Sequence, residues 1–136
     1  MSTRSRVGLL LENGSVISAY HHWDGYPEAL GAKLVKDFDT KDKVAELIDG
    51  GDISSCMATR TWEGVPCEEE FVLYYSERGD QDVEPSLSPT LGDFICLTKE
   101  NWGEYAYVFD VGVDRWFCYN MHDSQEINLY AREAVV

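Results

Sequence analysis

Basic residues are scarce in this sequence, which has 11 Lys and Arg against 25 Asp and Glu in 136 residues. The net charge of −14 excludes an ordinary nucleic-acid-binding protein, because contacts to phosphates need a surplus of Lys and Arg. It also disfavours docking on an anionic membrane. No apolar run is long enough to span a bilayer, and residues 7–11 are too few for a signal peptide. We therefore expect a cytoplasmic protein that contacts neither nucleic acid nor membrane directly.

Motifs for metals, cofactors and catalysis are also missing. The cysteines Cys56, Cys67, Cys96 and Cys118 form no C-x-x-C pair, which excludes a zinc knuckle and a thioredoxin-type motif. In a reducing compartment we expect buried free thiols. Walker A, G-x-G-x-x-G, H-E-x-x-H and G-x-S-x-G patterns are absent. These absences favour a non-catalytic protein over an enzyme and predict no cofactor and no metal.

The acidic residues are concentrated in the second half of the chain. Residues 1–60 hold seven basic and nine acidic side chains, whereas residues 61–136 hold four and sixteen. Solubility is the simplest explanation, since net charge keeps proteins dispersed. The alternative is an acidic surface that binds a protein with a basic surface. Its candidate partner-binding residues are Glu68, Glu69, Glu70, Glu77, Asp80, Asp82 and Glu84.

The hydrophobic pattern predicts one α+β domain over residues 1–136. Asn13-Gly14 between two apolar runs predicts a hairpin with a type I′ turn. Apolar residues at helical spacing predict helices over residues 27–38 and 41–49. We expect an antiparallel sheet with both helices on one side. The second half, over about residues 60–130, is acidic and expected to be β-rich. Its expected strands are 68–76, 104–110, 115–120 and an edge strand near 127–130. We expect a short strand or the entry to a turn at residues 92–97 and a loop at 78–89.

Functional side chains are densest where the hairpin of the first half (about residues 4–55) meets the first helix. His21, His22, Trp23, Asp24 and Tyr26 offer two imidazoles, an indole, a carboxylate and a phenol. The rings suit stacking on a base or sugar, and His22 with Asp24 suits hydrogen bonding or acid–base work. A helix N-terminus beside them attracts anions. The simpler interpretation is a structural turn with a core tryptophan.

Two arginines, Arg4 and Arg6, stand beside the first strand. Together they could clamp a phosphate or a carboxylate through bidentate hydrogen bonds, which makes Arg6 a further candidate ligand-binding residue. The simpler interpretation is a frayed basic N-terminus.

Several segments resemble a group of small bacteriophage-encoded proteins whose function is unknown. The likeness covers mainly residues 4–55, through SRVG at 5–8, NGSV at 13–16, YHHWDGYPE at 20–28, Gly31, and residues 43–48 and 51–54. A weaker echo lies in residues 104–109 and at Trp116. The resemblance implies a phage setting and the cytoplasm of a host cell. Small accessory proteins of phages inhibit host enzymes, block defence systems or redirect transcription.

Three functional hypotheses follow. The first is a non-catalytic phage accessory protein that binds and inhibits or redirects a host or defence protein through an acidic, aromatic-rich surface. The second is a module that binds or hydrolyses a small ligand such as a nucleotide signal at residues 21–28. The third is an inhibitor that mimics DNA. A homo-oligomer is compatible with each of them, since an aromatic sheet face can pair with itself.

Overall fold

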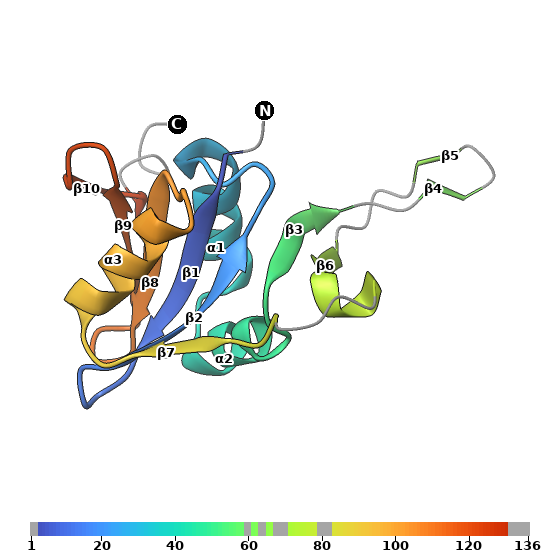
Figure 1. Ribbon diagram of the computed structural model, residues 1–136. Helices are drawn as coiled ribbons and strands as arrows, with labels where there is room; N and C mark the ends of the chain where they lie inside the picture. The colour runs from blue at the N-terminus through green and yellow to red at the C-terminus, as the bar shows by residue number, and fades with distance from the viewer. Residues whose placement is uncertain (1–2, 59–60, 63–64, 67–70, 79–82, 131–136) are drawn as a thin grey trace.

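A computed structural model of the protein describes residues 3–58, 61–62, 65–66, 71–78 and 83–130 (Figure 1). The main sheet has eight strands in the order β10-β9-β8-β1-β2-β3-β6, with β7 also paired to β2. Its strands are β1 (Ser5–Leu10), β2 (Val16–His21), β3 (Ile53–Ala58), β6 (Phe71–Tyr74), β7 (Ser86–Ser88), β8 (Tyr105–Asp110), β9 (Arg115–Asn120) and β10 (Glu126–Ile127). A separate two-stranded sheet contains β4 (Thr61–Trp62) and β5 (Val65–Pro66).

The helices are α1 (Ala32–Asp37), α2 (Lys41–Asp49) and α3 (Leu91–Glu100). A π-helical turn over Pro27–Gly31 leads into α1, so the predicted helix over residues 27–38 is present in two parts. The predicted helix over 41–49 coincides with α2, and the Thr40 side chain accepts the Lys43 N–H at its start. A short 3-10 turn over Tyr75–Arg78 follows β6.

The β1–β2 hairpin forms where Asn13-Gly14 predicts it, with Arg6 opposite Tyr20. Its turn is not the predicted type I′ turn, because Gly14 has a φ of +88° while Asn13 keeps a negative φ. The Gly14 N–H donates to the Leu11 carbonyl at 3.0 Å. A type I turn closed by a glycine in the left-handed region is the usual three-residue hairpin loop.

The α+β class is confirmed, but the sheet is mixed and not antiparallel throughout. β1 pairs in parallel with β8, from Ser5 opposite Tyr105 to Leu10 opposite Asp110. β2 pairs in parallel with β3 at His21 and Ile53. Short turns between apolar runs indicate antiparallel neighbours only, so these long-range pairs left no local pattern to read. As a result, β1 and β8 place the two halves of the chain side by side in one sheet.

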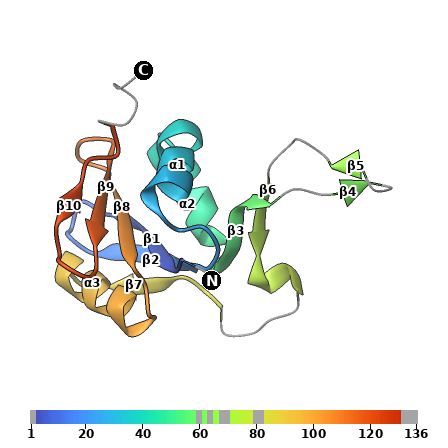
Figure 2. The ribbon, with the colours of Figure 1, turned by 90° about the horizontal axis from the view of Figure 1, so that it is seen from above.

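Helices cover both faces of the sheet, with α1 and α2 on one side and α3 on the other (Figure 2). Alternate residues of β8 show this division. Tyr107 and Phe109 pack in the core formed with α1 and α2, while Ala106 and Val108 pack with Phe94 of α3. The prediction of two helices on one side therefore missed a helix on the opposite face.

That helix, α3, lies where the sequence predicted a short strand or a turn entry at residues 92–97. Thr90 begins it, because its hydroxyl oxygen accepts the Asp93 N–H at 3.1 Å. Phe94 and Thr98 then point into the sheet. The predicted loop over 78–89 likewise contains the strand β7. The cysteines also divide: Cys56 and Cys118 are buried thiols, Cys96 on α3 is exposed, and Cys67 lies outside the described residues.

Candidate functional site

The residues of the predicted site at 21–28 point in two directions. His21 is fully buried, and its Nε2 accepts the Cys56 N–H at 3.1 Å. Burial, with a smaller contribution from His22, lowers the pKa of His21 to about 3. A neutral ring held in the core has no surface to offer a ligand, so His21 serves the packing of β2 on β3.

The Asp24-Gly25 turn closes against the start of the chain. Asp24 is exposed and has a φ of +55°. The Gly25 N–H donates to the Thr3 carbonyl at 2.9 Å, and the Gly25 carbonyl accepts the Tyr107 hydroxyl at 2.6 Å. A Cβ at Gly25 would lie 2.6 Å from the Thr3 carbonyl oxygen, so glycine is required here. Tyr26 beyond the turn is exposed.

His22 and Trp23 belong to an aromatic cluster on the α3 side of the sheet. His22 Nδ1 lies 2.7 Å from the Tyr20 hydroxyl oxygen, and its ring meets Trp23 edge-on at 4.8 Å between centroids. Burial raises the pKa of Tyr20 and lowers the pKa of His22, with the Arg4 charge adding to the second shift. Tyr20 therefore keeps its proton at neutral pH, and its hydroxyl shares a hydrogen bond with Nδ1 of a neutral His22.

Arg6 is buried beside this cluster, so the interpretation of a frayed basic N-terminus is wrong for Arg6. Its side chain is 4% exposed. Its Nε donates to Ser18 Oγ at 2.9 Å, one terminal nitrogen to Asn101 Oδ1 at 2.8 Å and the other to the Ser18 carbonyl at 3.1 Å. Since a guanidinium has five N–H donors, two have no protein acceptor among the described residues.

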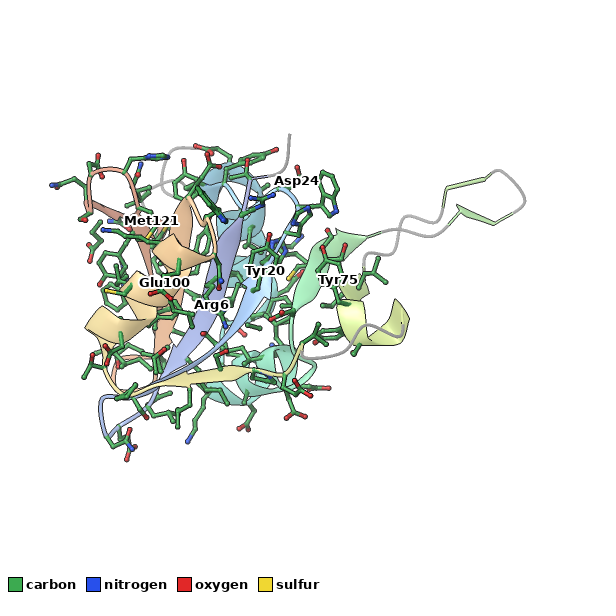
Figure 3. All side chains as sticks on the ribbon, viewed as in Figure 1. Arg6, Tyr20, Asp24, Tyr75, Glu100 and Met121 are labelled. Atoms are coloured by element: carbon green, nitrogen blue, oxygen red, sulfur yellow. The ribbon has the colours of Figure 1, made fainter. Side chains whose placement is uncertain are left out.

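Arg4, two positions earlier, faces the same side of β1. Its backbone carbonyl accepts the Glu104 N–H at 2.7 Å, which extends the β1–β8 pairing toward the start of the chain. Its charge acts on the Tyr20 hydroxyl and lowers the pKa of that group, against the larger effect of burial. Both arginines therefore lie on the face of the sheet that carries α3, near the end of that helix, and Figure 3 labels Arg6 and Tyr20 there.

We call the depression around these residues the Arg4 groove. It consists of two adjoining hollows that share Arg4 and Trp102. The inner hollow, of about 630 Å³, is lined by Arg4, Arg6, Tyr20, Asp52, Glu84, Glu100 and Trp102 among others. The outer hollow, of about 610 Å³, is lined by Arg4, Lys99, Trp102, Gly103, Glu104, Met121 and His122. In Figure 3 the labelled Glu100 belongs to the inner hollow and the labelled Met121 to the outer hollow.

The two hollows differ in charge. The inner one gathers three carboxylates, of Asp52, Glu84 and Glu100, around the buried Arg6. Burial raises the pKa of Asp52, while the Tyr20 N–H and Arg6 act in the opposite direction. The outer hollow has the cations Arg4 and Lys99 against a single carboxylate, Glu104. The groove therefore offers cations on its outer side and hydrogen-bond acceptors on its inner side.

Most of the predicted acidic partner surface is not placed by the structure. Glu68, Glu69, Glu70, Asp80 and Asp82 lie outside the described residues, and Glu77 belongs to the turn over Tyr75–Arg78. Glu84 is exposed and lines the inner hollow. The acidic partner surface, the mimicry of DNA and the phage setting thus stay predictions.

Sequence reasoning missed Tyr20, Asp52, Lys99, Glu100 and Trp102 as groove residues. One signal was available, because the register of a short hairpin places Arg6 opposite Tyr20. No comparable signal existed for Trp102, since the helix before it was not predicted.

Within the described ranges, no group of three or more His, Cys, Asp or Glu side chains is placed to hold a metal ion. The same residues contain no helix with the length and apolar content needed to cross a bilayer. Comparison of the chain with models of known protein families, with curated proteins and with solved structures finds no match.

Proposed function

We propose that this protein binds a small ligand through an anionic group in the Arg4 groove. Like the second hypothesis, this function is the binding of a small ligand. The site, however, is the surface between β1, β2 and the end of α3 and not residues 21–28. One observation carries it: Arg4 lines both hollows, and in the outer one Arg4 and Lys99 face a single carboxylate, that of Glu104.

The buried Arg6 has only neutral hydrogen-bond acceptors among the described residues, but Asp52, Glu84 and Glu100 line the same hollow and offset its positive charge there. Arg6 remains protonated at neutral pH, although burial lowers its pKa and Asp52 partly offsets that shift. Arg4 is more exposed than Arg6 and stands where both hollows open. Arg4 is therefore the arginine that contacts the ligand.

The outer side of Arg4 is where the anionic group fits. There Lys99 adds a second cation, whereas Asp52, Glu84 and Glu100 would repel an anion from the inner hollow. The backbone of Arg4 is fixed beside this hollow, because its carbonyl accepts the Glu104 N–H at 2.7 Å.

Thermal unfolding with inorganic phosphate at constant ionic strength tests this function. A ligand at 100 times its Kd adds about 2.7 kcal/mol to the free energy of unfolding, so Tm rises with phosphate concentration. Arg4→Gln is expected to abolish the rise. Arg115→Gln is the matched control, since Arg115 stacks on Tyr130 outside the groove, 3.9 Å from the ring centroid, and should respond like the wild type.

Two results would contradict the proposal. One is a Tm of the wild-type protein that does not change with phosphate at any concentration. The other is a rise of equal size in Arg4→Gln, which would place the phosphate elsewhere on the molecule.

A further inference from the structure

Trp102 has an unusual backbone position for a large aromatic residue. The Trp102 N–H donates to the Lys99 carbonyl at 3.1 Å and the Gly103 N–H donates to the Thr98 carbonyl at 2.9 Å. These two bonds form the motif that ends many helices, in which the first residue beyond the helix adopts a left-handed conformation. Glycine usually occupies that position, but here it holds Trp102 with a φ of +62°.

The indole of Trp102 contributes little to the core, because the residue is 77% exposed. Trp23 and Tyr26, the other large aromatic residues on the exposed surface of the described chain, are 46% and 39% exposed. A strained, exposed aromatic side chain that lines a groove is what a ligand platform requires, since its face is free and its backbone is fixed.

Arg4 and Trp102 are held in a fixed relation to each other. The Arg4 carbonyl accepts the N–H of Glu104, two residues after Trp102. The same two side chains are the ones shared by the inner and outer hollows. A guanidinium beside an exposed indole matches a ligand that joins an anionic group to a flat ring.

Nucleotides combine these two features. Their bases stack on aromatic side chains, and their phosphates form charge-assisted hydrogen bonds with arginine. The inner hollow adds Glu84 and Glu100, whose carboxylates accept hydrogen bonds from amino groups. The outer hollow favours a ligand with a single phosphate group, because the Glu104 carboxylate offsets part of the positive charge of Arg4 and Lys99 there.

Resting on the function proposed above, we propose that the ligand is a nucleoside monophosphate whose base carries an amino group. Its phosphate binds Arg4 and Lys99, its base stacks on Trp102, and the amino group of the base faces the carboxylates of Glu84 and Glu100. Trp102 is the residue that makes the site selective for nucleotides over other phosphorylated metabolites.

Titration calorimetry with cytidine monophosphate, uridine monophosphate and ribose 5-phosphate tests the ligand class. Stacking of one base should make the cytidine nucleotide bind about 5- to 150-fold tighter than ribose 5-phosphate. The uridine nucleotide should bind more weakly than the cytidine one, since uracil presents a carbonyl oxygen where cytosine presents its amino group.

Trp102→Leu should lower the affinity for the cytidine nucleotide to that for ribose 5-phosphate and leave ribose 5-phosphate binding unchanged. Arg4→Gln should weaken all three. Val113→Ala, which shortens an exposed apolar side chain on the β8–β9 turn, is the control for surface truncation and should bind like the wild type.

Equal binding of the cytidine nucleotide and ribose 5-phosphate by the wild type would overturn the ligand class and leave the anion site standing. So would a Trp102→Leu variant that weakens both ligands alike, or uridine monophosphate binding as tightly as the cytidine nucleotide. Absence of binding by all three probes and by inorganic phosphate would overturn the proposed function together with this inference.

Discussion

His21 and His22 are neighbours in the chain, yet the alternation of a strand sends one into the core and the other toward the Arg4 groove. The sequence predicted both as ligand-binding residues, because residue type alone does not say which face of β2 is covered. Arg6 shows the opposite error, since a charged residue near the start of a chain suggests fraying. Burial decided these three cases, and for Arg6 it involves Asn101 at the end of α3, a helix that was not predicted.

His21 makes the stability of the protein sensitive to acid. The unfolded chain binds a proton at His21 near pH 6.5, whereas the folded chain does so only near pH 3. The contribution is fully present above pH 6.5 and is lost as pH falls toward 3, by up to about 1.4 kcal/mol per pH unit. Urea unfolding at several pH values measures this slope.

His21→Gln should flatten the slope between pH 6.5 and 3, because the amide oxygen can still accept the Cys56 N–H and does not titrate in this range. His122→Gln replaces an exposed histidine that lines the outer hollow and should keep the wild-type slope. An unchanged slope in His21→Gln would show that the carboxylates alone cause the loss of stability in acid.

The left-handed backbone conformation of Trp102 should lower the stability of the protein. Trp102→Gly relieves a left-handed backbone conformation and removes a side chain that is 77% exposed. We expect the free energy of unfolding to rise by about 1 kcal/mol, measured in urea. The same variant should lose the preference for a nucleotide over ribose 5-phosphate. A decrease in stability would show that the indole contributes to packing.

At the scale of the element, α3 shows how local patterns mislead. Residues 92–97 were predicted as a short strand or a turn entry, because Gly92 and the apolar run around Phe94 weaken the helical pattern. The structure begins α3 after Thr90, whose hydroxyl oxygen accepts the Asp93 N–H and whose hydroxyl donates to Asp93 Oδ2. By contrast, the β1–β2 hairpin and α2 were predictable, since a turn or a cap brackets each of them within a few residues.

The packing of α3 on the sheet depends on the small size of Gly8. A Cβ at Gly8 would lie 2.7 Å from Val16 Cγ1 and 3.1 Å from the Phe94 ring. Gly8→Ala should therefore lower the free energy of unfolding by about 1–3 kcal/mol, measured in urea. Gly92 lies within α3, and a Cβ there would be 3.7 Å from its nearest neighbour, Thr90 Oγ1. Gly92→Ala should therefore raise the free energy of unfolding by about 0.4–1 kcal/mol. Equal effects of the two substitutions would contradict this account.

At the scale of the molecule, the site depends on contacts that no local pattern reports. The α+β class followed from composition and periodicity, as did the strands β8 and β9. The parallel pairing of β1 with β8 and the placement of α3 did not, because they join residues about a hundred positions apart. The Arg4 groove lies where these two long-range features meet, which is why the sequence located some of its residues and missed its position.

The parallel pairing of β1 with β8 also affects how the chain folds during synthesis. β1 can pair with β2 at once, but its other edge has no partner until Tyr105 follows Ser5 out of the ribosome. At ordinary rates of translation this takes about 5 to 20 s. An open strand edge invites pairing with other chains, and charged side chains on such a strand oppose it. Arg6 is on that strand and Arg4 directly precedes it, so these two cations would also protect the nascent protein from aggregation.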